Sequence, residues 1–291
     1  MPNLMKRFFL VSMFSLTLGM LISLGLGTLL AQPAVSTIGA IPHDLPIEPI
    51  LIKTTRGNTI SAWLILAKSS KGGVLLMHGV RSNRLQMVER ARFLYQAGYS
   101  SLLFDFQAHG ESTGEHITFG YLEQQDASAA FHYLKRRLPQ QKIAVLGVSL
   151  GGAAALLSDI PQQADALILE AVYSNLETAI ANRLEMRLGT IGHYLTPMLS
   201  WQIKPRLGFE LADLAPIKHI AQIKTPVLII AGAQDQHTKL AEAEQFYQLA
   251  PEPKELWILP QAIHQDFQDY APQIYQHKLL NFLEQSFKEL K

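Results

Sequence analysis

Apolar residues along this chain gather in short uninterrupted runs, and amphipathic stretches separate the runs. Gly73–Met77 and Ile143–Val148 carry no polar side chain, and 101–106 carries only a serine and an aspartate. Runs of this length and composition are typical of strands buried on both faces of a sheet. The stretch 84–97 instead repeats apolar residues at helical spacing and is followed by Gly98, which predicts a helix and its end.

The same alternation continues along most of the chain. We expect strands over 50–54, 59–67, 73–77, 101–106, 143–148, 166–169, 225–231 and 255–259, and helices over 84–97, 121–138, 238–249 and 270–287. Residues 173–214 break the rhythm, because glycines and prolines interrupt their helical pieces. Repeated strand–helix units predict a mostly parallel sheet with helices on both faces, and polar residues that follow the strands should meet at one edge of it.

The first 31 residues have a different pattern. Lys6 and Arg7 precede an uncharged apolar segment over 8–30, which as a helix is roughly 35 Å long and crosses a hydrocarbon core of ~30 Å. A signal peptide needs an apolar region of only ~7–15 residues. We therefore expect residues 1–31 to be an uncleaved membrane anchor, with a signal peptide cleaved near Ala34-Val35-Ser36 as the alternative.

The flanking charges predict an orientation for that segment. Positive residues precede it and none follows until Lys53, so the N-terminus should stay in the cytoplasm. We expect a single-pass protein of the cell membrane with the rest of the chain on the outer, periplasmic or extracellular side, or a secreted protein if the segment is cleaved. Residues 32–49 are Pro-rich and are expected to link the anchor to one large domain over 50–291.

Composition excludes several classes of function. The formal net charge is +1 and the body of the chain has no basic run, so we expect no nucleic-acid partner. The chain has no cysteine, which removes disulfides, a thiol nucleophile and cysteine-based metal sites. Glu123 and Asp126 are one helical turn apart but have no histidine at ligand spacing, so bracing of a loop is expected rather than a metal.

Ser149 stands where the apolar run Ile143–Val148 gives way to a small-residue helix, framed as Gly147-x-Ser149-x-Gly151. A strand, a very tight turn and a helix force the serine into a strained backbone conformation and leave no room for side chains two residues away. This predicts an exposed nucleophile at the start of a helix. The alternative is an ordinary serine that caps the helix.

Asp235 and His264 follow the next strands along the chain at the same edge of the expected sheet. A serine becomes nucleophilic when an imidazole accepts its proton, and a carboxylate fixes the tautomer of that imidazole. Each residue alone has a plain interpretation, as a turn aspartate and a surface histidine. Glu170 also follows a strand, but we expect it to brace the start of 173–214, so the predicted catalytic residues are Ser149, Asp235 and His264.

These features resemble the α/β-hydrolase superfamily, and the resemblance covers nearly everything from Ile50 onwards. The matching residues are His78-Gly79, Asp105-x-x-x-His109-Gly110-Glu111-Ser112, the turn around Ser149, Thr225-Pro226-Val227-Leu228-Ile229 with Gly232-x-x-Asp235, and Ala262-x-His264. The chain looks most similar to membrane-anchored serine hydrolases of bacterial type. The resemblance implies the α/β-hydrolase fold, with an eight-stranded, mostly parallel sheet whose second strand is antiparallel, and a small cap over 173–214.

The resemblance also places an oxyanion hole at the backbone N–H groups of Leu150 and Val80, with Arg81 as the fallback donor. In this family His78 and His109 are usually structural, and we expect that here. The predicted cap contains Tyr194, Met198, Leu199, Trp201 and Phe209. These residues could line an acyl pocket, although packing within the cap is the preferred interpretation.

The sequence therefore predicts a serine hydrolase that cleaves an ester-like acyl bond through an acyl-enzyme, without cofactor or metal. The expected partners are a small-molecule or lipid-like acyl substrate and the membrane. A thioesterase, an amidase or an acyltransferase would use the same residues. The other alternative is a non-catalytic binding protein of this fold at the membrane.

Overall fold

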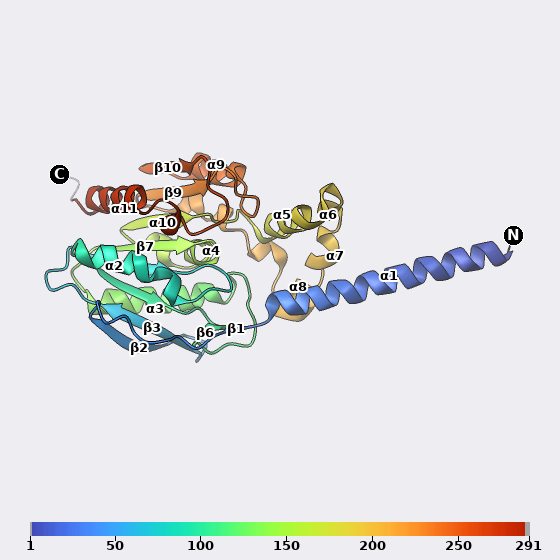
Figure 1. Cartoon of the computed structure of the whole chain (residues 1–291), viewed down its shortest axis with the longest axis horizontal. Coiled ribbons are helices and arrows are strands. Elements are labelled where there is room, and N and C mark those ends of the chain that lie inside the picture. The colour runs from blue at the N-terminus through green and yellow to red at the C-terminus, as the bar shows by residue number, and fades with distance from the viewer. Residues whose placement is uncertain (1, 289–291) are drawn as a thin grey trace.

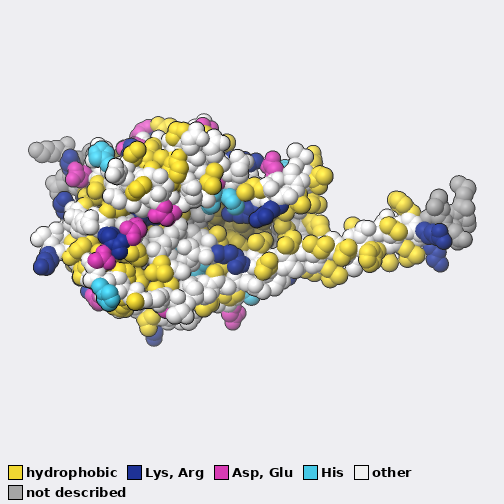
Figure 2. Space-filling view, viewed as in Figure 1, with side chains coloured by type: hydrophobic (Ala, Val, Ile, Leu, Met, Phe, Trp, Pro, Cys, Tyr) yellow, Lys and Arg dark blue, Asp and Glu magenta, His cyan; other side chains and the backbone are white. Residues whose placement is uncertain are grey.

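The computed structural model describes residues 2–288, and side chains from residue 5 onwards. A single long helix, α1 (Pro2–Ala31), projects from a body that contains the rest of the described chain (Figure 1). Within α1, residues Met5–Ala31 are long and apolar enough to cross a membrane, and few of them are buried against the body. Figure 2 shows hydrophobic side chains over much of the visible surface of this projecting helix.

The body is built on an eight-stranded sheet with the order β10-β9-β8-β7-β4-β5-β3-β2. β3 runs antiparallel to both of its neighbours, and the remaining pairs are parallel. The strands are β2 (Ile47–Lys53), β3 (Thr59–Ile65), β4 (Gly73–Met77), β5 (Ser100–Phe104), β7 (Ile143–Val148), β8 (Ala166–Glu170), β9 (Val227–Gly232) and β10 (Lys254–Leu259). The expected sheet, with its antiparallel second strand, is confirmed.

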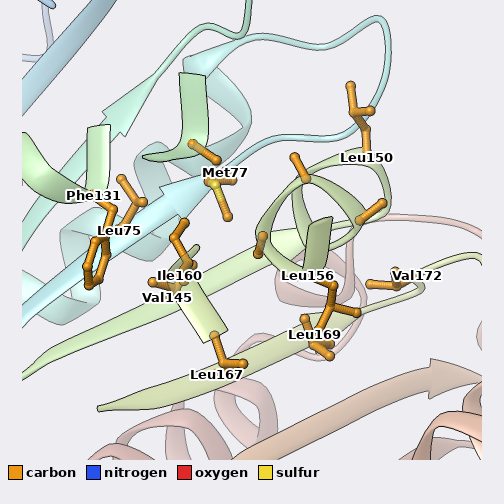
Figure 3. Close-up of a cluster of buried hydrophobic side chains, with 14 of the residues drawn as sticks. Leu75, Met77, Phe131, Val145, Leu150, Leu156, Ile160, Leu167, Leu169 and Val172 are labelled. Carbon is orange, nitrogen blue, oxygen red and sulfur yellow. The ribbon is translucent and has the colours of Figure 1, made fainter. Parts of the chain in front are cut away.

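Helices cover both faces of the sheet, as predicted. One face packs on α3 (Glu123–Arg137), α4 (Leu150–Leu157) and α9 (Leu240–Leu249), and the other on α2 (Val88–Gln96) and α11 (Pro272–Phe287). Alternate residues of one strand serve opposite faces: Leu75 and Met77 join the first core, and Val74 and Leu76 the second. Figure 3 shows Leu75, Met77 and Phe131 in the first core. This double burial explains why the central strands are apolar throughout.

Two predicted helices differ in detail from the observed ones. The helix expected over 84–97 begins with a 3-10 turn, η1 (Arg84–Met87), before α2. The helix expected over 270–287 is divided into α10 (Phe267–Tyr270) and α11, because Ala271 has φ −143° and ψ 61°. Pro272 explains this break, since the residue before a proline is pushed out of the helical region.

The segment 32–49, expected to be an irregular linker, packs on the body. β1 (Ala34–Val35) pairs in parallel with β6 (His109–Gly110), and Ile38 and Leu45 are buried. The strand expected to start at residue 50 already begins at Ile47. The prolines that suggested a loose linker are compatible with this path, because two-residue pairing and an edge strand need few backbone donors.

Residues 173–214 form short helices above one edge of the sheet. They are α5 (Leu176–Leu188), α6 (Thr190–Tyr194), α7 (Thr196–Ser200) and α8 (Ile203–Leu207), followed by the 3-10 turns η3 (Leu211–Asp213), η4 (Pro216–Lys218) and η5 (Ile220–Gln222). We call α5 to α8 the cap. Gly189 has φ 65° and Gly208 φ 81°, and each ends a helix. The cap lies between the sheet edge and α1 (Figure 1).

Candidate active site

Ser149 stands at a tight turn between β7 and α4, with φ 49° and ψ −106°. A non-glycine residue in this region of backbone space is strained. A Cβ added at Gly147 or at Gly151 would lie closer than 3.0 Å to backbone atoms of Gly152 and Met77 respectively. The backbone N–H of Ser149 donates to the carbonyl of Glu170 at 2.8 Å, which fixes the turn to β8. The strained serine and the steric need for both glycines are confirmed, but the serine expected to be exposed is buried, with 3% of its surface accessible.

Asp235 and His264 lie side by side at the ends of β9 and β10. The Nδ1 atom of His264 is 2.7 Å from Oδ2 of Asp235. The Asp235 side chain is fully buried, whereas the His264 side chain keeps 23% of its surface exposed. Burial alone would raise the pKa of the Asp235 carboxyl, but the hydrogen bond from His264 and its charge, helped by Thr238, hold that pKa below its usual value.

Thr238 completes the surroundings of this carboxylate and was not predicted. Its hydroxyl donates to Oδ2 of Asp235 at 2.7 Å, and its backbone N–H donates to Oδ1 at 3.0 Å. The backbone N–H of His237 reaches Oδ1 as well, at 2.7 Å. The sequence signal was a threonine three residues after an aspartate, a spacing common in polar turns. These bonds leave Asp235 as an oriented acceptor for the imidazole.

His237 is a second imidazole beside the predicted base. Its ring centroid is 4.8 Å from that of His264. Burial first, and then the neighbouring charges of His264 and Arg183, lower the pKa of His237. A histidine that stays neutral here adds no repulsion when His264 takes up a proton.

Ser149 and His264 both follow strands of the sheet, β7 and β10, but no hydrogen bond joins them in the described part of the chain. Among the described residues, the bonds of His264 go to Asp235 and, at 3.5 Å, to Thr238. The hydrogen bond between a catalytic serine and its histidine is often long in unliganded enzymes and shortens when substrate binds. The structure therefore brings Asp235 and His264 into contact and places Ser149 at the end of β7, which β8 separates from β9.

Val80 and Leu150, the predicted oxyanion donors, both line a pocket with Ser149. Leu150 is the first residue of α4, where a backbone N–H has no partner within the helix. Within residues 2–288, neither N–H is engaged in a hydrogen bond. The structure is thus compatible with the predicted pair, and Arg81 next to it has φ 58°.

The pocket above Ser149 is narrow and almost entirely apolar. It is partly open to solvent and lies between the β4–η1 loop, the cap and the end of α1. Apolar side chains from the cap that line it include Leu176, Ile180, Leu199, Ile203 and Leu207. Arg81, Arg183 and Arg206 also contribute to its walls. A site of this kind suits an apolar chain with a polar reacting group at one end.

The five cap residues singled out in the sequence differ in position. Leu199 lines the pocket, whereas Phe209 stacks on Tyr121 with ring centroids 4.4 Å apart. Tyr194 and Trp201 are exposed. The side chain of Met198 faces Gly19 of α1. Phe209 therefore packs on the body rather than within the cap, and a pocket role describes only Leu199 among the five.

Glu170, the alternative acid, is engaged elsewhere. Its carboxylate accepts from Nη2 of Arg90 at 2.8 Å and from the hydroxyl of Tyr275. Arg90 also donates from Nη1 to Asp266 at 2.9 Å, in the loop that follows His264. Glu170 thus ties β8 to α2 and α11 instead of bracing the start of 173–214 as expected, and its bonds do not go to the imidazole.

The remaining polar residues of the motif brace loops, as expected. Asp105 accepts from the backbone N–H of Glu111 at 2.9 Å, and Glu123 accepts from the backbone N–H of Thr118 at 2.9 Å. Asp126 accepts from the backbone of Gln107. No cluster that could hold a metal ion occurs among the described residues.

His78 is buried beside the same loop. It contacts the Gly79 carbonyl through Nδ1 at 2.7 Å and accepts from the N–H of Phe106 through Nε2 at 3.1 Å. Burial first, and then the charge of His109, lowers the pKa of His78 to about 3. Its contacts and neutral state give it a structural role.

Two family models and several known proteins match this chain. The family model described as "Serine aminopeptidase, S33" matches residues 68–211, and a model described as "PhoPQ-activated pathogenicity-related protein" matches residues 189–289. YqkD of Bacillus subtilis is 24% identical over 218 residues, which are 74% of this chain and 72% of YqkD. The Arabidopsis thaliana alpha/beta hydrolase domain-containing protein WAV2 is 28% identical over 264 residues, 83% of this chain and 80% of that protein.

Solved structures match most of this chain. The Pyrococcus furiosus esterase Pf2001 is 25% identical, with a TM-score of 0.72, and the match covers 88% of this chain and 98% of the esterase. An esterase from Exiguobacterium antarcticum has a TM-score of 0.61 at 17% identity, and the match covers 81% of this chain and all of that one.

Proposed function

The chain belongs to the α/β-hydrolase superfamily, and from that membership we propose that it is a serine hydrolase that cleaves a carboxylic ester through an acyl-enzyme. Hydrolase activity is supported by the matching family model and by the esterase neighbours. The serine mechanism is our own assignment. It gives Ser149 the role of nucleophile, His264 that of base and Asp235 that of orienting acid.

The observation that carries the proposal is the contact between His264 and Asp235, which follow strands of the same sheet as the strained turn of Ser149. The 2.7 Å distance joins Nδ1 of His264 to a fully buried carboxylate. A proton on Nδ1 leaves Nε2 free to accept the proton of a serine hydroxyl. A binding protein has no need for a strained serine, an oriented imidazole and a buried carboxylate at one edge of the sheet.

The reaction follows from these positions. Ser149 Oγ attacks the ester carbonyl while Nε2 of His264 takes its proton, and the tetrahedral oxygen is held by the N–H groups of Val80 and Leu150. Collapse breaks the bond to the alcohol, which leaves with the proton from His264. Water then attacks the acyl-enzyme with His264 again as base, and the acid is released as Ser149 recovers its proton.

The proposal is tested by active-site labelling and turnover. A fluorophosphonate probe should label the full chain in detergent, and Ser149→Ala should abolish the labelling and lower kcat/KM for p-nitrophenyl butyrate by roughly 10⁴ or more. The variant should keep the wild-type melting temperature, because it removes one oxygen. If Ser149→Ala kept more than a few per cent of the wild-type rate, the serine mechanism would be wrong.

A thioester or an amide would fit the same three residues. The choice of an ester rests on the matched esterases alone, and a side-by-side assay with the p-nitrophenyl ester, thioester and anilide of one acid separates them. We also propose that α1 anchors the protein in a membrane, because Met5–Ala31 are long and apolar enough to span one.

A further inference from the structure

The last turns of α1 form part of the pocket wall. Gly27, Leu30 and Ala31 line the pocket together with Ser149 and Leu150. The helix that is long enough to cross a membrane therefore ends beside the strained serine. Its removal would leave the apolar pocket open on that side.

Specific hydrogen bonds hold α1 against the cap. The side-chain amide of Gln202 donates to the carbonyl and to the hydroxyl oxygen of Ser23, both at 3.0 Å, and both side chains are buried. Arg206 donates to the hydroxyl oxygen of Thr28 at 2.7 Å and to the carbonyl of Leu24 at 2.9 Å. Buried polar contacts of this kind require a defined helix register.

Gly27 shows how closely the two parts approach. A Cβ added there would lie closer than 3.0 Å to the side chain of Gln202. Gly25, two residues earlier, has nothing within 4 Å of the corresponding position. The two glycines thus lie on different faces of one helix, one packed on the cap and one open.

The C-terminal end of α1 is also fixed to the body. Arg81 donates to the carbonyls of Leu29 and Leu30, which lack partners within the helix, and its positive charge suits the negative end of the helix dipole. The backbone N–H of Ile117 donates to the carbonyl of Ala31 at 2.9 Å. This end is therefore built into the domain.

The length of α1 brings the cap to the membrane. Met198 of the cap already faces Gly19 of α1. Of the apolar segment 8–30, only residues 8–18 therefore precede this contact with the cap. Eleven residues span about 16 Å at the helical rise, about half of the ~30 Å hydrocarbon core. If α1 spans the core, the rest of the span lies beside the cap, which places the side of α7 that faces α1 within the adjoining part of the bilayer and α6 close to it.

The exposed side chains of the cap agree with this placement. Leu188, Ile191, Tyr194 and Trp201 are all exposed on α6, α7 and their flanks. Tyrosine and tryptophan are favoured at the boundary between hydrocarbon and water. Figure 2 shows hydrophobic side chains continuing from the projecting helix onto the adjoining part of the body.

We propose that α1 and the cap together form an acyl-chain pocket that opens to the bilayer, and that the substrate is a long-chain acyl ester of a lipid in the same membrane. The chain enters between the end of α1 and α8, and its ester carbonyl reaches Ser149. This inference rests on the proposed function for its reaction, but the pocket itself can be tested without turnover.

The first test compares two glycines of one helix in the full-length protein, reconstituted in phosphatidylcholine vesicles. Gly27→Leu places a side chain between α1 and Gln202 and narrows the pocket, whereas Gly25→Leu adds the same side chain on the open face. We expect Gly27→Leu to lower kcat/KM for p-nitrophenyl palmitate about tenfold or more, with p-nitrophenyl acetate changed less than about twofold. Gly25→Leu should leave both values near the wild type.

If the ratio of kcat/KM for p-nitrophenyl palmitate to that for p-nitrophenyl acetate were the same in Gly27→Leu and Gly25→Leu, the pocket proposal would be overturned. Leu30→Trp, with Leu26→Trp as its matched control, provides the same comparison if Gly27→Leu fails to accumulate. Leu30 lines the pocket, and Leu26 does not. Fluorophosphonate labelling of each variant reports that the site around Ser149 is folded.

The second test separates the pocket from the chemistry. The full-length Ser149→Ala variant is reconstituted with a palmitoyl glycerol ester that carries a diazirine at the end of its chain, and cross-linked peptides are mapped. Cross-links to Gly27–Ala31 and α8 would support the pocket, even if the wild type hydrolysed no ester and the proposed function failed. Cross-links confined to the outer part of α1, over 8–18, would overturn it.

Discussion

Arg90 and Glu170 form an ion pair with 2.8 Å between Nη2 and Oε2, and each side chain keeps only 1% of its surface exposed. The pair links α2 to the end of β8, one strand away from the turn of Ser149. Tyr275 donates to the other carboxylate oxygen of Glu170. Of the two carboxylates that follow strands near His264, one is therefore committed to the core, and only Asp235 contacts the imidazole.

The two carboxylates should separate activity from stability when they are compared directly. Asp235→Asn should lower kcat/KM by up to roughly 10⁴, because the imidazole loses its tautomer and its counter-charge, with a melting temperature close to the wild type. Glu170→Gln should keep most of the activity of the folded protein but destabilise it by about 3 kcal/mol, because the buried Arg90 loses one of its two carboxylate partners and keeps only Asp266. Turnover and thermal melts of both variants provide the check. If Glu170→Gln lost its activity while Asp235→Asn lost only stability, Glu170 would be the acid.

Gly151→Val should prevent formation of the turn around Ser149. An added Cβ at Gly151 lies closer than 3.0 Å to the Met77 carbonyl, a backbone atom that cannot rotate away. We expect a loss of stability of about 3 kcal/mol or more, above the usual range for overpacking. Gly39→Val is the matched control, because nothing lies within 4 Å of its added Cβ. A Gly151→Val protein with wild-type melting and fluorophosphonate labelling would contradict the geometry of the turn.

His78 should make stability fall as the pH is lowered. Its pKa is about 3 in the folded protein, against 6.5 ordinarily, so between those values the unfolded chain binds a proton that the folded chain does not. Stability from this residue is fully present above pH 6.5 and is lost by about 1.4 kcal/mol per pH unit below it. Thermal melts between pH 4.5 and 7.5 should show a shallower dependence in His78→Gln. Identical slopes in the two proteins would show that His78 is not the group that titrates.

The orientation of α1 is a further expectation. Lys6 and Arg7 should hold the N-terminus in the cytoplasm, and the body should lie on the other side of the membrane. A phosphatase reporter fused at the C-terminus should be active only after export, and a cytoplasmic reporter at the same place should be inactive. The N-terminal peptide should be found by mass spectrometry in the mature membrane protein. A mature chain that begins near Thr37 would instead identify a cleaved signal peptide, and it would remove Gly27 from the pocket.

Local patterns explain what could be predicted from the sequence. The positions of the strands followed from apolar runs, whereas the eight-stranded sheet and its antiparallel second strand followed only from a resemblance carried by short motifs. The turn of Ser149 followed from two glycines, because steric crowding acts on neighbours in the chain. Asp235 and His264 could be placed because residues after parallel strands meet at one edge, and their 2.7 Å contact agrees with that expectation.

Contacts between distant residues have no comparable signature. Arg90 and Glu170 are 80 positions apart, and Ser23 and Gln202 are 179 positions apart. A single buried arginine or a serine within an apolar helix does not reveal its partner. For the same reason the chain between residues 32 and 49 was expected to be loose, although β1 and two buried side chains attach it to the body.

The contact between Ser23 and Gln202 also imposes an order on the making of this protein. A ribosome that adds about 5–20 residues per second completes α8 roughly 10 to 35 s after α1 has emerged. During that interval α1 waits as an exposed apolar helix, with Gly27 and Ser23 still without their partners. With α1 anchored as we propose, its insertion into a bilayer during synthesis would protect it from aggregation, and the cap would then fold onto a helix that is already in place. The helix that closes the pocket is therefore synthesised before the other residues that line it.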